Sequence, residues 1–339
     1  MVKREIQQNE SIKREKNKGS VTILNEWEKL AALSNRRLTL RNSNIPIKLS
    51  WSIDRLTIVG ELQTIRVHER NFSRKMDVVE YTFDQVMATF EEKGFAEKVG
   101  EGWKLKDKYG ENVAYFEKVK FAENKGRMDF NPNKIGRFIG EDLKHFIHRV
   151  FIAPHFSRAD IACDIVGAPN DLMRNHELIE VLSKKLFYGL NGKIETKYWG
   201  SRSSEKQVRL YNKLKEQRDK KKVVPLDIKS WWRFELQLRQ GKAEIWTDIV
   251  TKTLASFCSP EYIPDSIKGS KKIMLVGLLS DTSLFSELGS EAKAKYRKLL
   301  REVAEVDEVT QHMLASFSEQ YSDLKNELDS WLNGLDVDY

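Results

Sequence analysis

Residues 207–213 read Gln-Val-Arg-Leu-Tyr-Asn-Lys, and residues 232–239 read Trp-Arg-Phe-Glu-Leu-Gln-Leu-Arg. Both stretches alternate apolar and polar side chains, which is the pattern of a β-strand with one buried and one polar face. Upstream of them, Asn191-Gly192 is a strong signal for a two-residue hairpin turn. We therefore expect antiparallel strands over residues 194–200, 207–213 and 231–239.

The rest of the chain divides into mixed and helical parts. Strand patterns cover residues 49–60, 114–121, 127–130 and 156–166, and helical patterns cover residues 21–33, 78–92, 139–150 and 172–188. Beyond residue 242 the strand signal disappears, and helices are expected over residues 243–257, 271–280, 290–304 and 307–333. The prediction is an α+β fold with a largely antiparallel sheet over residues 21–240, followed by a helical portion over residues 241–335.

Composition sets limits on the class of protein. The 339 residues are 40% hydrophobic and 32% charged, which excludes a mostly disordered chain and an integral membrane protein. With 58 Lys and Arg against 50 Asp and Glu the net charge is +8, which favours a polyanionic partner. Residues 1–20 are basic and poor in apolar side chains, so we expect a disordered tail. No secretory signal follows the basic start, and Cys163 and Cys258 lack CxxC spacing, so a cytoplasmic location with reduced thiols is expected.

Two absences restrict the chemistry. The sequence has no GxxxxGK[ST] motif, so ATP hydrolysis is not expected. The six histidines form no His-apolar-His pair of the kind that many DNA-nicking enzymes use to hold a metal ion. Any metal should therefore bind carboxylates, which suit Mg²⁺ or Mn²⁺.

A tyrosine flanked by cations is the main candidate for covalent chemistry. At period two, Arg209, Tyr211 and Lys213 project from the same strand face. A phenol has a pKa near ~10, and its attack on a phosphodiester needs the phenolate, which neighbouring positive charge favours. A solvated basic strand would show the same pattern, and this alternative stays open.

Acidic residues occupy comparable positions on two other strands. Asp160 and Asp164 share one face of their strand, and Glu235 shares a face with Arg233 and Gln237. If these strands neighbour that of Tyr211, a metal held by the carboxylates could polarise a phosphate. The alternative is a set of cross-strand salt bridges.

Several ordered motifs together resemble those of one family. They are Ser52-Ile-Asp-Arg-Leu-Thr-Ile-Val-Gly60, Arg127-Met-Asp-Phe-Asn-Pro-Asn-Lys134, Arg158-Ala-Asp-Ile-Ala-Cys-Asp164, residues 188–200, Arg209-Leu-Tyr-Asn-Lys213 and Trp232-Arg-Phe-Glu-Leu236. In this order they resemble motifs of the Rep_trans replication initiators of small rolling-circle bacterial plasmids. The resemblance covers roughly residues 48–335 and departs from the family pattern at Asp129, where a glutamate is expected.

The resemblance implies a nuclease-like domain that binds a plasmid double-strand origin and nicks one strand. It implies a 5′-phosphotyrosine intermediate and a 3′-OH for the host DNA polymerase, with a host helicase as a further partner. Tyr211 takes the nucleophile's place, flanked by Arg209 and Lys213, and Tyr198 is its local rival. Dependence on Mg²⁺ or Mn²⁺ and a homodimer are also implied, with Asp160, Asp164 and Glu235 as candidate metal or acid-base residues.

Candidate DNA contacts lie in two regions. Arg202 and Lys215 flank the tyrosine strand in a segment rich in Lys and Arg. In the helix expected over residues 290–304, Lys293, Arg297 and Arg301 lie on one face, opposite an apolar face, in the region where the family discriminates origins. An ordinary surface helix would look the same.

Three functions remain open at this stage. The first is a plasmid replication initiator, and the second is a relaxase of a mobile element that uses the same chemistry at another site. The third is a DNA-binding repressor without catalysis. A tyrosine recombinase fits less well, because no Arg, His and Arg set precedes a C-terminal tyrosine.

Overall fold

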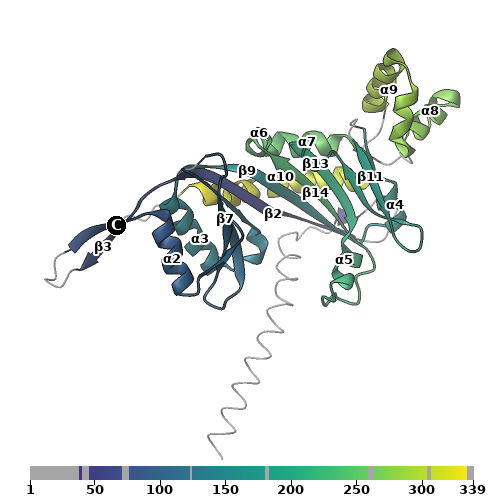
Figure 1. Ribbon diagram of the computed structural model, residues 1–339. Helices are drawn as coiled ribbons and strands as arrows, with labels where there is room; N and C mark the ends of the chain where they lie inside the picture. The colour runs from purple at the N-terminus through teal and green to yellow at the C-terminus, as the bar shows by residue number, and fades with distance from the viewer. Residues whose placement is uncertain are drawn as a thin grey trace, which may run out of the picture.

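The computed structural model describes residues 38–39, 46–70, 76–122, 124–179, 183–258, 263–303 and 307–333. The tail expected over residues 1–20 and the helix expected over residues 21–33 lie outside the described residues. Within the described ranges the chain forms one large, mainly antiparallel sheet with helices against it (Figure 1). The predicted α+β fold with a helical C-terminal region is confirmed.

Eleven strands form this sheet in the order β11-β12-β13-β14-β9-β2-β8-β7-β6-β5, with β1 also paired to β2. Their bounds are β1 Leu38–Thr39, β2 Pro46–Leu62, β5 Ala96–Val99, β6 Gly102–Lys106, β7 Asn112–Lys118, β8 Lys125–Phe130, β9 Phe151–Val166, β11 Lys184–Tyr188, β12 Ile194–Trp199, β13 Lys206–Asn212 and β14 Trp231–Arg239. Two smaller sheets pair β3 (Ile65–Arg70) with β4 (Met76–Tyr81), and β10 (Glu177–Leu178) with β15 (Phe257–Cys258).

One face of the large sheet carries the main core. The helices that pack there are α2 (Phe83–Glu92), α3 (Arg137–Val150), α7 (Trp246–Ala255) and α10 (Glu308–Leu332). Trp51 of β2, for example, meets Phe317 of α10 edge to face with ring centroids 5.0 Å apart. The other face carries the polar side chains of the strands, and α5 (Lys213–Asp219) packs over one end of it (Figure 1). This division leaves a polar sheet face available for a ligand.

The helices between residues 269 and 303 form a second, smaller core. It is built by α8 (Gly269–Ser280), the 3₁₀ helix η3 (Thr282–Glu287) and α9 (Ser290–Val303), around Leu275, Leu279 and Leu300. This group stands away from the large sheet in Figure 1, whereas α10 returns to the sheet. The remaining short helices are η1 (Pro132–Lys134), α4 (Asn170–Asn175) and α6 (Gly241–Glu244). Among the described helices, none combines the length and the apolar character needed to span a bilayer.

The prediction of a helix over residues 172–188 is wrong. The structure has the short helix α4, then β10, and then β11, which pairs with β12 at the sheet edge. Lys197 explains part of this difference, because its buried ammonium group donates to a Glu177 carboxylate oxygen at 2.6 Å. Such long-range contacts override local helix propensity. Similarly, residues 78–81 lie in β4, and α2 begins only after the Thr82 capping box.

A bulge in β2 changes which residues face the polar side. Ser50 and Ser52 pair with Asp164 and Ala162 of β9, and the register then shifts between Ile53 and Arg55. Because the extra residue is Asp54, both Asp54 and Arg55 reach the polar face beside β9. Beyond the bulge Leu56 returns to the apolar core.

Glu327 of α10 gives a testable pH dependence of stability. Burial raises the pKa of this carboxyl to about 7, against an ordinary value of 4.5, although Lys144 opposes the shift. The unfolded chain loses this proton first, so stability falls as pH rises from 4.5 through 7. Glu327→Gln should therefore raise the free energy of unfolding at pH 8 by up to about 3 kcal/mol and change it little at pH 4.5.

Urea unfolding at the two pH values measures this effect. Asp323→Asn, at an exposed position of the same helix, is the control and should show no comparable gain at pH 8. An equal gain for Glu327→Gln at both pH values would contradict the assignment.

Candidate active site

Tyr211 lies at the end of β13, directly before α5. Asn212 ends the strand and caps the helix, because its side-chain oxygen accepts a hydrogen bond from the Lys215 amide at 3.0 Å. The phenol is only 3% exposed but forms part of a cavity wall. Its ring lies 3.7 Å from the guanidinium carbon of Arg209, and its Oη is 3.1 Å from Lys213 Nζ. The predicted grouping of Arg209, Tyr211 and Lys213 is therefore present, but Lys213 is the first residue of α5 and not part of the strand as expected.

Lys213 is held at the phenol by an acidic residue of α5. Glu216 lies 2.6 Å from Lys213 Nζ and 2.7 Å from Lys220 Nζ. Burial opposes ionisation of Glu216, but hydrogen bonds from these two lysines lower its pKa to about 2. The pKa of Lys213 is lowered by burial and by Arg233. The phenol thus touches an amine that gives up its proton more readily than a free lysine.

The ionisation of Tyr211 itself differs from the sequence-based interpretation. Burial raises the phenol pKa well above its ordinary value, and Glu235 adds to the shift. Arg233 and Arg209 lower it, as expected for neighbouring cations, but burial dominates. In the protein alone the phenol is therefore a neutral hydrogen-bonding group, so DNA or a base must promote its ionisation.

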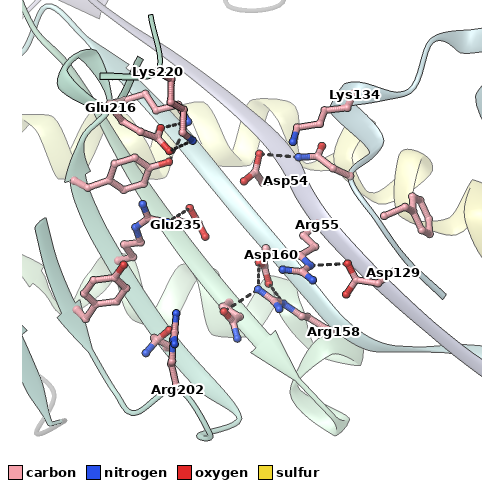
Figure 2. Close-up of a pocket in the computed structure, with 18 of the residues that line it drawn as sticks. Asp54, Arg55, Asp129, Lys134, Arg158, Asp160, Arg202, Glu216, Lys220 and Glu235 are labelled. Atoms are coloured by element: carbon pink, nitrogen blue, oxygen red, sulfur yellow. Dashed lines mark hydrogen bonds and ion pairs between the residues drawn. The ribbon is translucent and has the colours of Figure 1, made fainter. Parts of the chain in front are cut away.

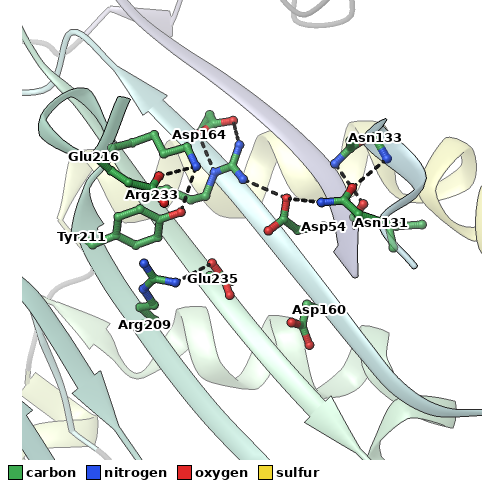
Figure 3. A network of polar contacts seen from close by, with 12 residues as sticks. Asp54, Asn131, Asn133, Asp160, Asp164, Arg209, Tyr211, Glu216, Arg233 and Glu235 are labelled. Carbon is green, nitrogen blue, oxygen red and sulfur yellow. Dashed lines mark hydrogen bonds and ion pairs between the residues drawn. The ribbon is translucent and has the colours of Figure 1, made fainter. Parts of the chain in front are cut away.

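A buried ion network lies beside Tyr211 on the next two strands. Arg233 of β14 pairs with Tyr211 across the strands, and its guanidinium binds both carboxylate oxygens of Asp164, at 2.5 and 2.8 Å. Trp231 Nε1 donates to the same carboxylate at 2.7 Å. A third guanidinium nitrogen lies 3.0 Å from Asp54 (Figure 3). The network fixes the bulge of β2 against the strand that neighbours Tyr211.

The other two predicted carboxylates face the cavity. Asp160 accepts two hydrogen bonds from Arg158, at 2.6 and 2.8 Å, although burial still raises its pKa. Glu235 lies 3.6 Å from Arg209, and burial raises its pKa to about 6. Glu235 is thus the less strongly paired acid of the two.

These positions bear on the expected metal ion. Among the described residues, no three His, Cys, Asp or Glu side chains are arranged to hold a metal. Asp160 and Glu235 line the cavity, whereas Asp164 is occupied by Arg233 and Trp231 and does not line it. Two carboxylates suffice for Mg²⁺ when waters and a phosphate complete its shell. Glu235 fits that requirement and Asp164 does not. Asp160 lines the cavity, but Arg158 binds both of its carboxylate oxygens, so a metal ion would have to displace that arginine.

The cavity extends across the polar face of the sheet and has a volume of about 780 Å³. Nine basic and five acidic residues line it, so its net charge suits a polyanion. Figure 2 shows Glu216 and Lys220 at the upper left of the cavity, Arg55 and Asp129 at the right, and Arg202 at the bottom. Tyr198 also lines the cavity, with its ring 5.7 Å from the Arg209 guanidinium carbon.

The predicted DNA contacts are distributed unevenly around this cavity. Arg202 lines it, but Lys215 does not, and Lys215 instead pairs with Asp219 at 2.8 Å. Lys293 and Arg297 are half-buried on α9, where Arg297 lies 5.5 Å from the Phe285 ring. The side chain of Arg301 is outside the described residues.

Some site residues were missed by sequence reasoning. Asp54 and Arg55 reach the cavity through the β2 bulge, whose only sequence signal is the shift in apolar spacing from Ile53 to Leu56. Glu216 lies in the segment rich in Lys and Arg, and its signal is its position three residues after Lys213, one helical turn away. Arg239 continues the alternation of polar side chains along β14, so its place at the cavity could have been predicted from the sequence.

Comparisons with known proteins show what the chain is similar to. Residues 154–263 match the Rep_trans family model, described as a replication initiation factor. Through this region the chain is similar to the Rep_trans family. The match includes β9, β13 and β14, which carry Tyr211 and the residues around it, and it confirms the resemblance drawn from the motifs.

Full-length relatives extend the Rep_trans match. One replication initiation protein of Staphylococcus aureus is 29% identical over 303 residues, covering 88% of this chain and 90% of that protein. Another from the same organism is 28% identical over 332 residues, covering 96% of each chain. The solved rolling circle replication initiator protein from Geobacillus stearothermophilus aligns with a TM-score of 0.39 and 16% identity, covering 68% of this chain and 97% of that one.

Proposed function

We propose that this protein initiates rolling-circle plasmid replication by nicking one strand of the double-strand origin. The observation that carries the proposal is Tyr211, which lies in the wall of a cationic cavity with Lys213 on its oxygen, inside the Rep_trans region. The resemblance and the named relatives support origin DNA as the substrate. The absence of a GxxxxGK[ST] motif agrees with transesterification, which needs no ATP.

The proposed reaction exchanges one phosphoester for another. Tyr211 Oη forms a bond to phosphorus, and the bond from phosphorus to the 3′ oxygen breaks. The phenol proton passes to Lys213 in its neutral form and is then available to the departing 3′ oxygen, which leaves as a hydroxyl group. Arg209, which lies over the ring, is placed to neutralise charge on the phosphate.

The products follow from this chemistry. The protein stays on the 5′ end through a phosphotyrosine, and the free 3′-OH can be extended by a host DNA polymerase while a host helicase separates the strands. Asp160 and Glu235 would hold Mg²⁺ or Mn²⁺, which when bound would offset negative charge on the phosphate. We further propose that the protein acts as a homodimer, as the family resemblance implies, and that it works in the cytoplasm.

Incubation with a supercoiled origin plasmid and Mg²⁺ tests the proposal. Wild-type protein should yield open circles and a covalent protein–DNA adduct on a denaturing gel. Specific binding without nicking would indicate the repressor, and nicking only at a transfer origin of a mobile element would indicate the relaxase. The control plasmid carries a scrambled origin and should give no adduct.

We also propose that α9 contributes to origin binding. Lys293, Arg297 and Arg301 remain the predicted contacts, and Lys295 and Lys298 are the more exposed cations of this helix. Replacing both Lys295 and Lys298 by Ala should weaken origin binding and lower the slope of log Kd against log salt by about 2, at about 0.9 per phosphate contact. Binding measured from 50 to 200 mM salt checks this, and an unchanged slope would remove α9 from the DNA surface.

A further inference from the structure

Four arginines gather at the end of the cavity away from Tyr211. They come from β2, from β9, from the loop before β13 and from the end of β14, and they are Arg55, Arg158, Arg202 and Arg239. The strands bring three of them together, because Arg239 pairs with Arg158, and Arg158 pairs with Thr57, two residues from Arg55. Figure 2 shows Arg55 and Arg158 close together, and Arg202 further down at the lower left. We call these four residues the arginine cluster.

The arginine cluster holds more positive than negative charge. Arg55 donates to Asp129 at 2.7 Å, and Arg158 binds Asp160, so two carboxylates face four guanidinium groups. Arg239 donates instead to the backbone carbonyl oxygens of Arg202 and Ser204. Within the described ranges no ion pair joins Arg239 to a carboxylate. The pKa of Arg239 is lowered by burial and then by Arg158, which reflects crowding of like charges.

Two buried donors between the cluster and Tyr211 also lack an acceptor. Gln237 Nε2 has no hydrogen-bond partner among the described residues, although Gln237 Oε1 accepts from Arg158 at 2.9 Å. Arg209 Nε is likewise without a partner in the described part of the chain. Both residues line the cavity. Buried donors are normally satisfied, so these two add unmatched donor capacity to a cavity wall that already carries excess positive charge.

The rise per residue along β14 sets the distance between the arginine cluster and Tyr211. Tyr211 pairs with Arg233, and Arg239 lies six residues further along β14, which corresponds to about 20 Å at ~3.3 Å per residue. At the ~3.4 Å rise of one DNA strand, this span covers about six nucleotides, and fewer if the strand is extended. A single strand that runs along β14 can therefore occupy both ends of the cavity.

From this arrangement we infer that the arginine cluster is a second phosphate subsite, which binds the backbone of the same DNA strand about six nucleotides or fewer from the phosphate at Tyr211. This inference rests on the proposed nicking function and adds the path of the strand. It assigns the cluster to positioning the strand, because phosphate contacts fix register and carry no sequence information directly.

Binding of single-stranded oligonucleotides of increasing length tests the second subsite. Oligonucleotides that contain the nick sequence are lengthened by two nucleotides at a time, on the 5′ side in one series and on the 3′ side in the other, with EDTA present. For wild type, affinity should rise by about 5- to 10-fold at one length step in one series. The salt slope should rise there by about 0.7 for each added phosphate contact.

Three variants separate the subsite from a structural effect. Arg55→Gln, at a side chain that is 46% exposed, should abolish this rise in affinity. Asp129→Asn should make the rise in affinity larger, because it removes a carboxylate that competes with the phosphate. Lys325→Ala removes one exposed charge from α10 on the opposite side of the sheet and should leave the step unchanged. Opposite effects of Arg55→Gln and Asp129→Asn are not expected from a purely structural role.

The outcomes distinguish the two proposals. If wild type forms no covalent adduct on any substrate, the nicking function fails. If the adduct forms but neither series shows a step, or if Arg55→Gln retains it, the second subsite is wrong and the nicking function stands.

Discussion

Tyr211→Phe is expected to abolish the covalent protein–DNA adduct while origin binding is retained. The substitution removes only the phenolic oxygen and keeps the ring that packs against Arg209. No other group of the proposed reaction can replace that oxygen as the nucleophile, so the nicking rate should fall by at least about 10⁴-fold. Lys213 keeps its ion pair with Glu216, so the cavity should keep its charge and its affinity for DNA. Denaturing gels measure the adduct, and a mobility-shift titration measures binding.

Tyr198→Phe is the matched control for this prediction. Tyr198 lines the same cavity and contacts the same arginine, and its ring also packs against Phe187 at 5.7 Å. Its loss of a hydroxyl group should leave adduct formation intact. Peptide mapping of the trapped adduct should find the nucleotide on Tyr211. Loss of the adduct in the Tyr198 variant alone, or a nucleotide mapped to another residue, would overturn the assignment.

The parts of the site that follow strand periodicity could be predicted from sequence. Alternation alone placed Arg209 and Tyr211 on one face, and it placed Asp160 and Glu235 on polar faces of their strands. The structure brings all four to one cavity. Periodicity identifies a face but not the neighbouring strand, so the pairing of β13 with β14 and of β14 with β9 came only from the structure.

The residues that did not follow expectation depend on contacts between distant segments. Asp164 lies on the strand face expected for a metal ligand. Arg233 of the neighbouring strand lies beside it on the same face, and its guanidinium binds both carboxylate oxygens of Asp164. Local sequence does not reveal that competition. Likewise, burial of Tyr211 depends on the strand and helix around it, so its raised pKa could not be inferred from flanking cations.

The segment 172–188 shows the same limit for secondary structure. Its apolar spacing suits a helix, yet Leu186 pairs with Lys197 of the neighbouring strand. Glu177 is drawn into a buried cluster with Lys197 and Trp199, which are 20 or more residues away in sequence. Where such contacts are available, they outweigh the small differences in local propensity.

Arg233→Met is expected to destabilise the fold strongly. The variant leaves Asp164, which is buried, without the guanidinium that binds both of its oxygens, and it removes the ion pair to Asp54. Removing one partner of a buried pair costs about 3–5 kcal/mol, because the remaining charge is uncompensated. Such a loss is a large part of the stability of an ordinary protein. The free energy of unfolding from urea titration at pH 7 measures it.

Two further variants show whether buried charge is the cause. Arg55→Met removes an arginine that pairs with Asp129 on the same face but is 46% exposed, so it should cost no more than about 1 kcal/mol. Combining Arg233→Met with Asp164→Asn removes the uncompensated charge and should recover part of the lost stability. Equal costs for the Arg233 and Arg55 variants, or no recovery in the double variant, would contradict this account. The recovered protein should still form the adduct poorly, because Arg233 also holds the Asp54 bulge against the strand next to Tyr211.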